Sequence, residues 1–395
     1  MYAHVNLSRL CTRVSLRASM ATLCCSNYGN IVSYKPPAWC SSISEKAPKS
    51  RLILSQMKTP IVPWNVPDLP DGFKLYIKRD DMTGGTLMGN KVRKLEFLLE
   101  DAKLQGADAV ITCGGIQSNH CRATAIAARE VGLKTYLLLR SNSEDPDESR
   151  LEGNLLLDLL VDATVVLVPK RAGYVSQLMP RMQHVVDELK EKKLMNVYQI
   201  PLGGSNGVGT WGYVEAYREM MEQEVFSQIS DVVVPCGSGG TSCGLGLASY
   251  LSGSTVRVHG VSVCDDQLYF HTHCNEILNE MGVTGVRSED ILDVVDGYKG
   301  IGYGESTDEE LQLLTNIGRK TGILLDPTYT LKAVRGMLIE MKTNPSRFSG
   351  RNVMFIHTGG LYGMLDGRLD DVMRKQVTDS RQIISYFSTD RPPHL

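Results

Sequence analysis

Beyond residue 50, short apolar runs alternate with longer segments whose apolar residues recur every three or four positions. The short runs are rich in valine, isoleucine and leucine, which is typical of buried β-strands. The longer segments, such as 119–132 and 318–341, have the period of amphipathic helices. Because apolar strands that alternate with helices form parallel sheets covered on both faces, the pattern predicts the α/β class. The predicted strands are residues 74–80, 108–114, 134–140, 164–170, 197–203, 231–237, 256–263 and 352–360.

The strands divide into two consecutive groups. Four of them fall within residues 94–204, which we expect to form a small domain. Residues 46–93 plus 205–380 would form a larger domain, followed by a tail over residues 381–395. Ligands of such sheets bind beyond the carboxyl ends of the strands, so a cleft between the two domains is the expected site.

The composition excludes several classes of partner. The 395-residue chain has a formal net charge of −2, which supplies no positive field for nucleic acid or an anionic membrane. Its most apolar windows are broken by glycine and serine, so no membrane-spanning helix is expected. The ten cysteines include no C-x-x-C pair, and no metal site is predicted. We expect reduced thiols in an intracellular compartment and a small-molecule ligand held by local features.

The N-terminal region differs from the rest of the chain. The first 44 residues contain no Asp or Glu, and Arg9, Arg13 and Arg17 recur every four residues among Ser, Leu and Val. That composition is typical of an organelle transit peptide, and we expect residues 1–45 to be a disordered leader that directs the chain to mitochondria. A merely disordered tail is the alternative, and Met20 offers a second start that would give a cytoplasmic form.

The clearest candidate for an anion site is a glycine-rich loop, GSGGT, over residues 237–241. It leads from an apolar strand into a helix, so its backbone N–H groups surround the positive end of a helix dipole. No lysine follows as in a Walker loop, and Ser242 stands where a dinucleotide fingerprint has its third glycine. Asp265 and Asp266 at the end of the next strand keep a nucleotide-binding alternative open, but a single phosphate monoester fits the loop better.

A second glycine-rich turn follows the strand 108–114. Gly115 precedes the run Ser118-Asn119-His120 at the start of a helical segment. Ser118 is a good N-cap, and a cap alone is one explanation of this turn. Two glycines also let the backbone approach a ligand closely, so Ser118, Asn119 and His120 would present N–H groups to a carboxylate. A substrate that bears a carboxylate is consistent with this turn.

Two further turns carry hydroxyl groups. Asp326 and the proline after it suit the N-cap and the first position of a helix, which would place Tyr329 and Thr330 in its first turn. A tyrosine at such a position is more often a packing residue than a catalytic one. The strand 352–360 ends in Thr358 and two glycines, and a hydroxyl there is a suitable ligand for a heterocycle nitrogen.

Lys91 stands at a junction between a glycine-rich turn and a helix, directly after Gly89 and Asn90. A solvated lysine is the simplest explanation, and it is the one we give for Lys94 one turn later. A phosphate cradle, a carboxylate cradle and hydroxyls in place of a metal instead indicate that Lys91 serves pyridoxal phosphate chemistry on an amino acid. A lysine forms a Schiff base with this cofactor and then acts as a base at Cα, and burial would lower its pKa.

Five segments together resemble one enzyme family in order and spacing. They are GNKVRKLEFL (89–98), GGIQSNHCRATA (114–125), VVPCGSGGT (233–241), LDPTYTLKA (325–333) and FIHTGG (355–360). The family is that of D-cysteine desulfhydrase and 1-aminocyclopropane-1-carboxylate (ACC) deaminase, which are fold-type-II, tryptophan-synthase-β-like enzymes. The resemblance covers residues 50–376. It implies two three-layer αβα domains with twisted, mainly parallel sheets, pyridoxal 5′-phosphate as cofactor and a homodimer.

The resemblance also assigns roles residue by residue. Lys91 would be the Schiff-base lysine, and Ser118 would take part in proton transfer. Tyr303, in the run KGIGYGE, and Tyr329 look like the family's two active-site tyrosines. The residues expected to hold the cofactor are Asn90, Lys91, Gly237, Ser238, Gly239, Gly240, Thr241, Thr330 and Thr358. Those expected to hold the substrate are Ser118, Asn119, His120 and Tyr329.

Two positions separate the branches of this family. ACC deaminases typically carry Glu where this chain has Thr330 and Leu where it has Thr358, so the threonine pair resembles the desulfhydrases. A carboxylate near the pyridine nitrogen strengthens the electron sink that opening of a cyclopropane ring requires, whereas a hydroxyl suffices for loss of a thiolate from Cβ. The chain departs from the family at Leu331, where glycine is usual.

The resemblance therefore implies β-elimination on a D-amino acid, with D-cysteine converted to pyruvate, ammonia and hydrogen sulfide. ACC deamination, or elimination from another β-substituted amino acid, is the alternative within the family. From a different class, a nucleotide-binding oxidoreductase or a non-catalytic ligand-binding protein stays open. No nucleic acid or membrane partner is expected.

Overall fold

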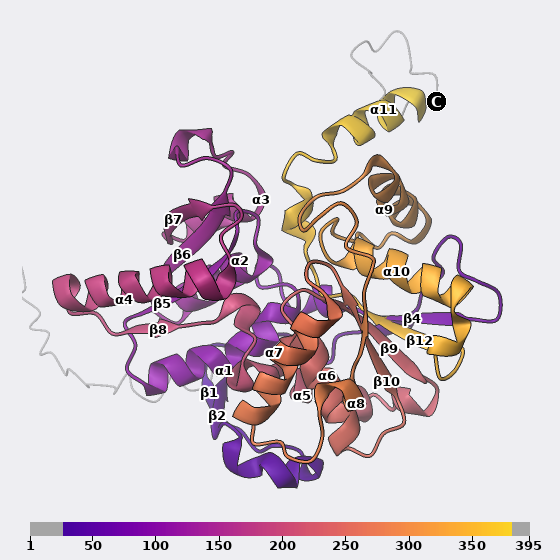
Figure 1. The fold of residues 1–395 in the computed structure, drawn as a ribbon, viewed down its shortest axis with the longest axis horizontal. Coiled ribbons are helices and arrows are strands. Elements are labelled where there is room, and N and C mark those ends of the chain that lie inside the picture. Colours follow the sequence, from indigo (N-terminus) through magenta and orange to yellow (C-terminus); the bar gives the residue numbers. More distant parts are fainter. Residues whose placement is uncertain (1–26, 381–395) are drawn as a thin grey trace, which may run out of the picture.

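The computed structural model describes residues 27–380, which form two larger β-sheets and a small ribbon of two strands (Figure 1). The six-stranded sheet is parallel except for the edge pair β3–β4. In spatial order its strands are β11 (Asp293–Val295), β10 (Arg257–Ser262), β9 (Asp231–Cys236), β12 (Asn352–Ile356), β4 (Lys74–Lys78) and β3 (Ile61–Pro63). The four-stranded sheet is parallel throughout. Its order is β7 (Thr164–Pro169), β6 (Lys134–Ser141), β5 (Ala109–Gly115) and β8 (Val197–Gln199).

Helices cover both faces of each sheet, which confirms the predicted α/β class. Val232 and Val234 of β9 pack in a core with α5 and α6, whereas Val233 between them packs in a second core with α9 and α10. In the four-stranded sheet Val110 faces α1 and α2, and Ile111 faces α4. The helices are α1 (Asn90–Leu104), α2 (Asn119–Glu130), α3 (Gly153–Leu160), α4 (Met179–Lys193), α5 (Gly207–Glu222), α6 (Gly240–Leu251), α7 (Gln267–Glu280), α8 (Ser288–Ile291), α9 (Asp308–Thr321), α10 (Thr330–Thr343) and α11 (Asp370–Ser380).

Each of the predicted strands overlaps a strand of the structure, but some boundaries are wrong. β8 ends at Gln199, because Pro201 has no N–H group to continue a ladder. The helical period over residues 318–341 belongs to two helices. The first, α9, ends before Gly322, whose φ of 70° is a conformation that favours glycine. The strands β3 and β11 were not predicted, because a run of three residues is too short to show the apolar pattern of a strand.

The chain is folded well before residue 46, so the predicted leader is too long. Residues 1–26, with the three arginines of the leader, and the tail 381–395 lie outside the described residues. From residue 27 onward, β1 (Ile31–Ser33) pairs with β2 (Ser50–Leu52), and Tyr34 is buried with its hydroxyl donating to Glu215 at 2.7 Å. The absence of acidic residues up to position 44 indicated a leader, and it gave no sign that residues such as Tyr34 pack in the core. Within residues 27–380, no helix is long and apolar enough to cross a bilayer.

A buried cluster of charges fixes the start of α1. Arg93 of α1 donates to Asp80 at 2.8 Å and to Glu219 of α5 at 2.9 Å. Lys78 of β4 reaches the same Glu219 at 2.6 Å, and the hydroxyl of Tyr213 donates to Asp80 at 2.9 Å. The three elements that meet here are thereby held in one arrangement, just behind Lys91.

Another buried group makes stability depend on pH. The ring of His259 lies 2.9 Å from Asp231 and 2.7 Å from Asp293, so it joins the strands β9, β10 and β11. Burial opposes its charge, but the two carboxylates outweigh burial and raise the pKa of His259. A raised folded-state pKa stabilises the fold fully below the ordinary histidine value of about 6.5, and the gain is lost as pH rises through the folded pKa.

The free energy of unfolding should therefore fall by roughly 1.5–3 kcal/mol as pH rises above the folded pKa of His259. This decrease is the typical contribution of a hydrogen bond to a charged group. Urea unfolding between pH 6 and 9 measures this decrease. His259→Gln removes the titrating group and should flatten the profile in that range. A profile that keeps its slope in this variant would contradict the assignment.

Candidate functional site

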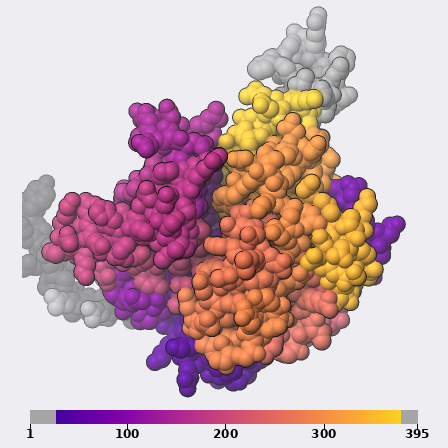
Figure 2. All heavy atoms as spheres, in the orientation of Figure 1, coloured from indigo at the N-terminus to yellow at the C-terminus, as the bar shows by residue number. Residues whose placement is uncertain are grey.

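The carboxyl ends of both sheets border one cavity of about 530 Å³. Turns after β5, β6 and β7 of the four-stranded sheet meet turns after β9, β10 and β12 of the six-stranded sheet there. In the space-filling view, the magenta segments around the four-stranded sheet meet the orange segments, which lie between β10 and β12 in the chain, along a groove (Figure 2). The cavity thus occupies the place where ligands of parallel sheets bind.

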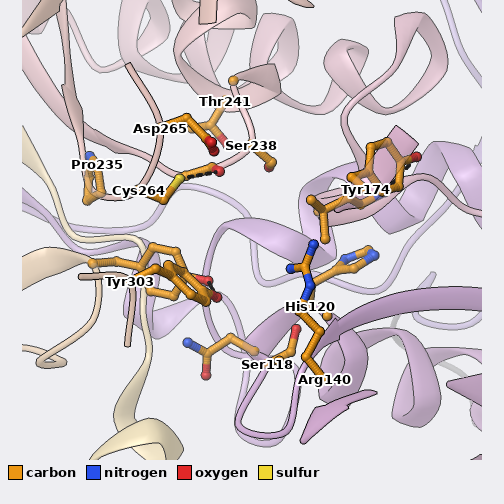
Figure 3. Close-up of a pocket in the computed structure, with 18 of the residues that line it drawn as sticks. Ser118, His120, Arg140, Tyr174, Pro235, Ser238, Thr241, Cys264, Asp265 and Tyr303 are labelled. Carbon is orange, nitrogen blue, oxygen red and sulfur yellow. Dashed lines mark hydrogen bonds between the residues drawn. The ribbon is translucent and has the colours of Figure 1, made fainter. Parts of the chain in front are cut away.

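Most of the residues predicted to form a site line this cavity, and Figure 3 shows several of them. They come from segments that are distant in the sequence. The predicted residues that line it are Asn90, Lys91, Ser118, Asn119, His120, Gly237, Ser238, Gly239, Thr241, Tyr303, Tyr329 and Thr358. Two predicted cofactor-binding residues, Gly240 and Thr330, do not line it.

Lys91 is the second residue of α1, and its side chain lines the cavity. The turn before it is tight: a Cβ on Gly359 would lie 2.7 Å from Cα of Gly89, which has a φ of 102°. The N–H group of Asn90 donates to the carbonyl of Thr358 at 3.1 Å, which fixes the start of the helix against the end of β12. Nζ of Lys91 makes no hydrogen bond within residues 27–380. Burial lowers the pKa of Lys91 to about 8, so part of the amine is unprotonated at neutral pH.

The glycine-rich loop between β9 and α6 lies on the side of the six-stranded sheet. Gly239 has a φ of 83°, a conformation that favours glycine, and α6 begins at the next residue. Nδ2 of Asn90 donates to Oγ1 of Thr241 at 3.1 Å, and Oγ of Ser238 lies 2.8 Å from Oγ of Ser205. The first N–H groups of a helix have no acceptor within the helix, so this loop with its two hydroxyls suits a phosphate group.

The turn between β5 and α2 lies on the side of the four-stranded sheet. Ser118 is the N-cap of α2, as predicted, and its Oγ accepts from the N–H group of Cys121 at 3.2 Å. The ring of His120 is buried, 2.9 Å from Oγ1 of Thr112. Burial and the charges of two nearby lysines hold the pKa of His120 well below its ordinary value. This ring is therefore neutral at physiological pH.

Asn154 of α3 sets the orientation of the Asn119 side chain. Nε of Arg122 donates to Oδ1 of Asn154 at 3.2 Å, so the amide nitrogen of Asn154 faces the other way. That nitrogen donates to Oδ1 of Asn119 and to the carbonyl of Gln117, both at 3.0 Å. Because Oδ1 of Asn119 is occupied, its amino group is left to donate into the cavity. Such a donor suits a carboxylate.

Asn154→Asp should reverse this arrangement. An aspartate keeps its contact with Arg122 but offers only acceptors, so the Asn119 amide turns over and presents oxygen to the cavity. If Asn119 holds the substrate's carboxylate, KM should rise roughly 10–100-fold while kcat changes less, as for loss of a charge-assisted hydrogen bond. Steady-state kinetics measure both constants. Asn279→Asp, on the exposed side of α7, is the matched control, and an unchanged KM in Asn154→Asp would contradict the role of Asn119.

Tyr303 and Tyr329 meet at the cavity wall. Their hydroxyl oxygens are 2.5 Å apart, and their rings lie edge to face with centroids 5.8 Å apart. Burial raises the pKa of both phenols, that of Tyr303 to about 12, so both keep their protons at neutral pH. The pair is therefore equipped to pass a proton to a group in the cavity.

Thr330, whose hydroxyl was expected to face the cofactor, does not line the cavity. The helix begins at Thr330 and not at Pro327, and Oγ1 of Thr330 lies 2.8 Å from Oδ1 of Asp326. The buried carboxyl group of Asp326 also accepts from the N–H groups of Thr328 and Tyr329, and Asp326 itself lines the cavity. The hydroxyl of Thr330 thus makes its hydrogen bonds within its own turn.

Two other residues lie directly behind the glycine-rich loop and not on the cavity wall. Gly240 does not line the cavity, and its N–H group donates to Oγ of Ser205 at 3.2 Å. Lys94, expected to be solvated, is buried, and its Nζ donates to Ser205 at 3.0 Å and to the carbonyl of Gly203 at 3.2 Å. A Cβ on Gly240 would lie 3.0 Å from that Nζ. This lysine therefore supports the loop from behind.

Several residues that line the cavity were not predicted. Arg140 and Lys170 stand at the ends of β6 and β7, and Cys264 follows β10. Asp265, noted in the sequence only for the nucleotide-binding alternative, lines the cavity beside Cys264. A charged residue at the carboxyl end of an apolar strand was the available signal for Arg140 and Lys170. Tyr174 also lines the cavity, but nothing in its local sequence sets it apart from a packing residue.

Comparisons with known proteins agree with one another. A family model described as pyridoxal-phosphate dependent enzyme matches residues 53–359. The chain is 44% identical over 357 residues to an Arabidopsis thaliana protein named bifunctional D-cysteine desulfhydrase/1-aminocyclopropane-1-carboxylate deaminase, mitochondrial. That match covers 89% of this chain and 88% of the relative. A putative ACC deaminase of Thermotoga maritima is 43% identical over 296 residues, which are 74% of this chain and 90% of the relative.

Solved structures show the same likeness. A crystal structure described as an ACC deaminase homologue superposes with a TM-score of 0.72 at 34% sequence identity. The superposition covers 86% of this chain and 99% of that chain. The similarity thus extends over nearly the whole length of the solved protein.

Proposed function

Since this chain belongs to the family of pyridoxal-phosphate dependent enzymes, we propose that it catalyses β-elimination on a D-amino acid. The proposed substrate is D-cysteine, which with one water gives pyruvate, ammonia and hydrogen sulfide. The observation that carries this proposal is the position of the Lys91 amine, which makes no hydrogen bond within residues 27–380. The amine lies between the glycine-rich loop 237–241, which suits a phosphate, and the turn 118–120, which suits a carboxylate. The name of the Arabidopsis relative supports the choice of substrate. Membership of this family argues against the two alternatives of a nucleotide-binding oxidoreductase and a non-catalytic ligand-binding protein.

The residues around the cavity fit pyridoxal 5′-phosphate. The start of α6 and the hydroxyls of Ser238 and Thr241 suit its phosphate. Lys91 supplies the amine that such a cofactor requires, and Thr358 lines the wall nearby. A side chain at Gly203 would collide with Ser238, so the space beside the loop depends on a glycine at this position.

The chemistry that pyridoxal phosphate supplies when bound is an aldehyde for the substrate amine and a ring that draws electrons away from Cα. The turn 118–120 holds the substrate's carboxylate. Lys91, with its pKa lowered to about 8, takes the Cα proton at Nζ, and the hydroxyl of Ser118 assists this transfer. Tyr303 and Tyr329 orient the substrate and give a proton to the departing sulfur. The released enamine hydrolyses in water to pyruvate and ammonia.

Deamination of ACC is the second candidate, and one observation favours it. The hydroxyl expected from Thr330 is absent from the cavity wall, and the carboxyl group of Asp326 is present there. Burial raises the pKa of this carboxyl, which still accepts several hydrogen bonds from its own turn. Of the two threonines that resemble the desulfhydrases, only Thr358 therefore lines the cavity.

A screen for keto-acid release tests the proposed function. The purified holoenzyme is given D-cysteine, L-cysteine, D-serine, β-chloro-D-alanine and ACC in turn. We expect pyruvate and sulfide in equal amounts from D-cysteine. Absence of pyruvate from D-cysteine would overturn the proposal, and 2-oxobutyrate from ACC would establish the second activity.

We also propose the division into a small domain, 94–204, and a large domain, 46–93 plus 205–380. The strands of the four-stranded sheet all fall between residues 109 and 199, and those of the six-stranded sheet lie outside that range. Amide hydrogen exchange tests the division: β5, β6, β7 and β8 should open as one cooperative unit and β4, β9, β10 and β12 as another.

We propose further that the full-length chain is mitochondrial and forms a homodimer. The Arabidopsis relative carries the word mitochondrial in its name, and the acid-free segment with Arg9, Arg13 and Arg17 is consistent with import. A full chain tagged at its C-terminus should lose mitochondrial localisation when the three arginines become glutamate. Translation from Met20 would give a cytoplasmic form.

The proposal of a homodimer rests on the family resemblance. Light scattering of the purified protein should give twice the mass of one chain.

A further inference from the structure

Arg140, at the carboxyl end of β6, brings into the cavity a charge that the proposed reaction does not use. Its Nε donates to the carbonyl of Ala172 at 2.9 Å, which fixes the side chain. Its two terminal amino groups make no hydrogen bond within residues 27–380. Figure 3 shows the side chain rising toward the middle of the cavity. Its donors therefore point into the space that a ligand would occupy.

Acidic groups on the cavity wall do not neutralise this guanidinium. Glu305 is half exposed and pairs with Lys170 at 3.3 Å. The carboxyl group of Asp326 accepts hydrogen bonds from its own turn. Asp265 lies beside the glycine-rich loop, away from Arg140, in Figure 3. The positive charge of Arg140 is thus available to an anion.

Arg140 also borders the place proposed for the substrate. In the parallel register of β5 and β6 it stands directly opposite Gly115, at the start of the turn that leads to Ser118. Its charge favours the ionised form of Tyr303 and so counteracts part of the rise in that pKa caused by burial. An amino acid held by its carboxylate at this turn therefore extends its side chain into space bordered by Arg140 and the tyrosines.

We propose that Arg140 is a second anion-binding position, which selects amino acids that carry an acidic group on Cβ. This rests on the proposed function, because it takes the α-carboxylate of the substrate to lie at the turn 118–120. A guanidinium binds a carboxylate, sulfinate or sulfonate through two parallel hydrogen bonds, which are stronger than neutral ones. A partly enclosed cavity strengthens them further.

D-Aspartate and D-asparagine test this inference, because they share one shape and differ in the charge on Cβ. Neither carries a good leaving group, so equilibrium dialysis against the holoenzyme measures binding without turnover. We expect the wild type to bind D-aspartate about tenfold or more tightly than D-asparagine. In Arg140→Gln the two affinities should fall within about threefold of each other. Lys134→Gln makes the same charge change at the exposed start of β6 and should keep the full preference.

Equal affinities in the wild type, or a preference that survives in Arg140→Gln, would overturn the inference. Arg140→Lys keeps the charge without the two-pronged geometry and should retain part of the preference, even if glutamine disturbs β6. The result is separable from the proposed function. A preference that depends on Arg140, without pyruvate from D-cysteine, would contradict the elimination alone. Pyruvate from D-cysteine without any preference would contradict the anion site alone.

Discussion

Lys91→Ala should lower kcat for elimination by roughly 10⁴-fold or more, because it removes both the amine that bonds the cofactor and the base at Cα. The fold should be unaffected, since Nζ of Lys91 makes no hydrogen bond within residues 27–380. Pyruvate release in a coupled assay measures the loss. Borohydride treatment followed by peptide mass spectrometry should find the cofactor attached at residue 91 in the wild type only.

Lys103→Ala is the matched control for this experiment. Lys103 lies in the last turn of the same helix, where it is exposed and donates only to the carbonyl of Val131 at 3.1 Å. Its removal should leave kcat within about twofold, as for surface substitutions generally. Substantial elimination by Lys91→Ala would refute the assignment of Lys91 and would direct attention to another amine at the cavity.

Arg93→Met should destabilise the protein by about 3–5 kcal/mol, the cost of removing one partner from a buried ion pair. The side chain of Arg93 is 1% exposed, and its loss leaves the carboxylates of Asp80 and Glu219 with Lys78 as the remaining cation. Urea unfolding monitored by circular dichroism measures the change. Activity should fall as well, since the cluster lies directly behind Lys91.

A surface ion pair to the same helix, α5, provides the comparison. Lys58 lies 3.7 Å from Glu222, and the two side chains are 67% and 51% exposed. Lys58→Met should change the free energy of unfolding by no more than about 1 kcal/mol, because water screens such pairs. If the two variants lost similar amounts of stability, burial would not be the reason for the effect of Arg93.

Strand ends carried most of the functional information in the sequence. Apolar runs located the strands, and the first polar or glycine residues after them fell on the cavity wall, as at Ser118, Ser238 and Thr358. This succeeds because parallel strands bring their carboxyl ends to one edge whatever their order in the sheet. Arg140 carried the same signal and was overlooked.

Residues whose environment depends on distant segments were not predictable in this way. Lys94, one turn after Lys91, was expected to be solvated, yet it is buried against Ser205, more than a hundred residues away. Thr330 was misplaced because a carboxyl group four residues earlier captured its hydroxyl. Asn154, which orients Asn119, has no local motif at all.

The contact between Gly89 and Gly359 limits how this chain tolerates sequence change. A Cβ on Gly89 would lie 2.5 Å from the carbonyl oxygen of Thr358, and one on Gly359 would lie 2.7 Å from Cα of Gly89. Both residues also have a positive φ. Overpacking in a core is commonly rescued by a smaller residue opposite, but here neither partner has a side chain to reduce. In a saturation library, loss of activity at either position should therefore find no suppressor at the other.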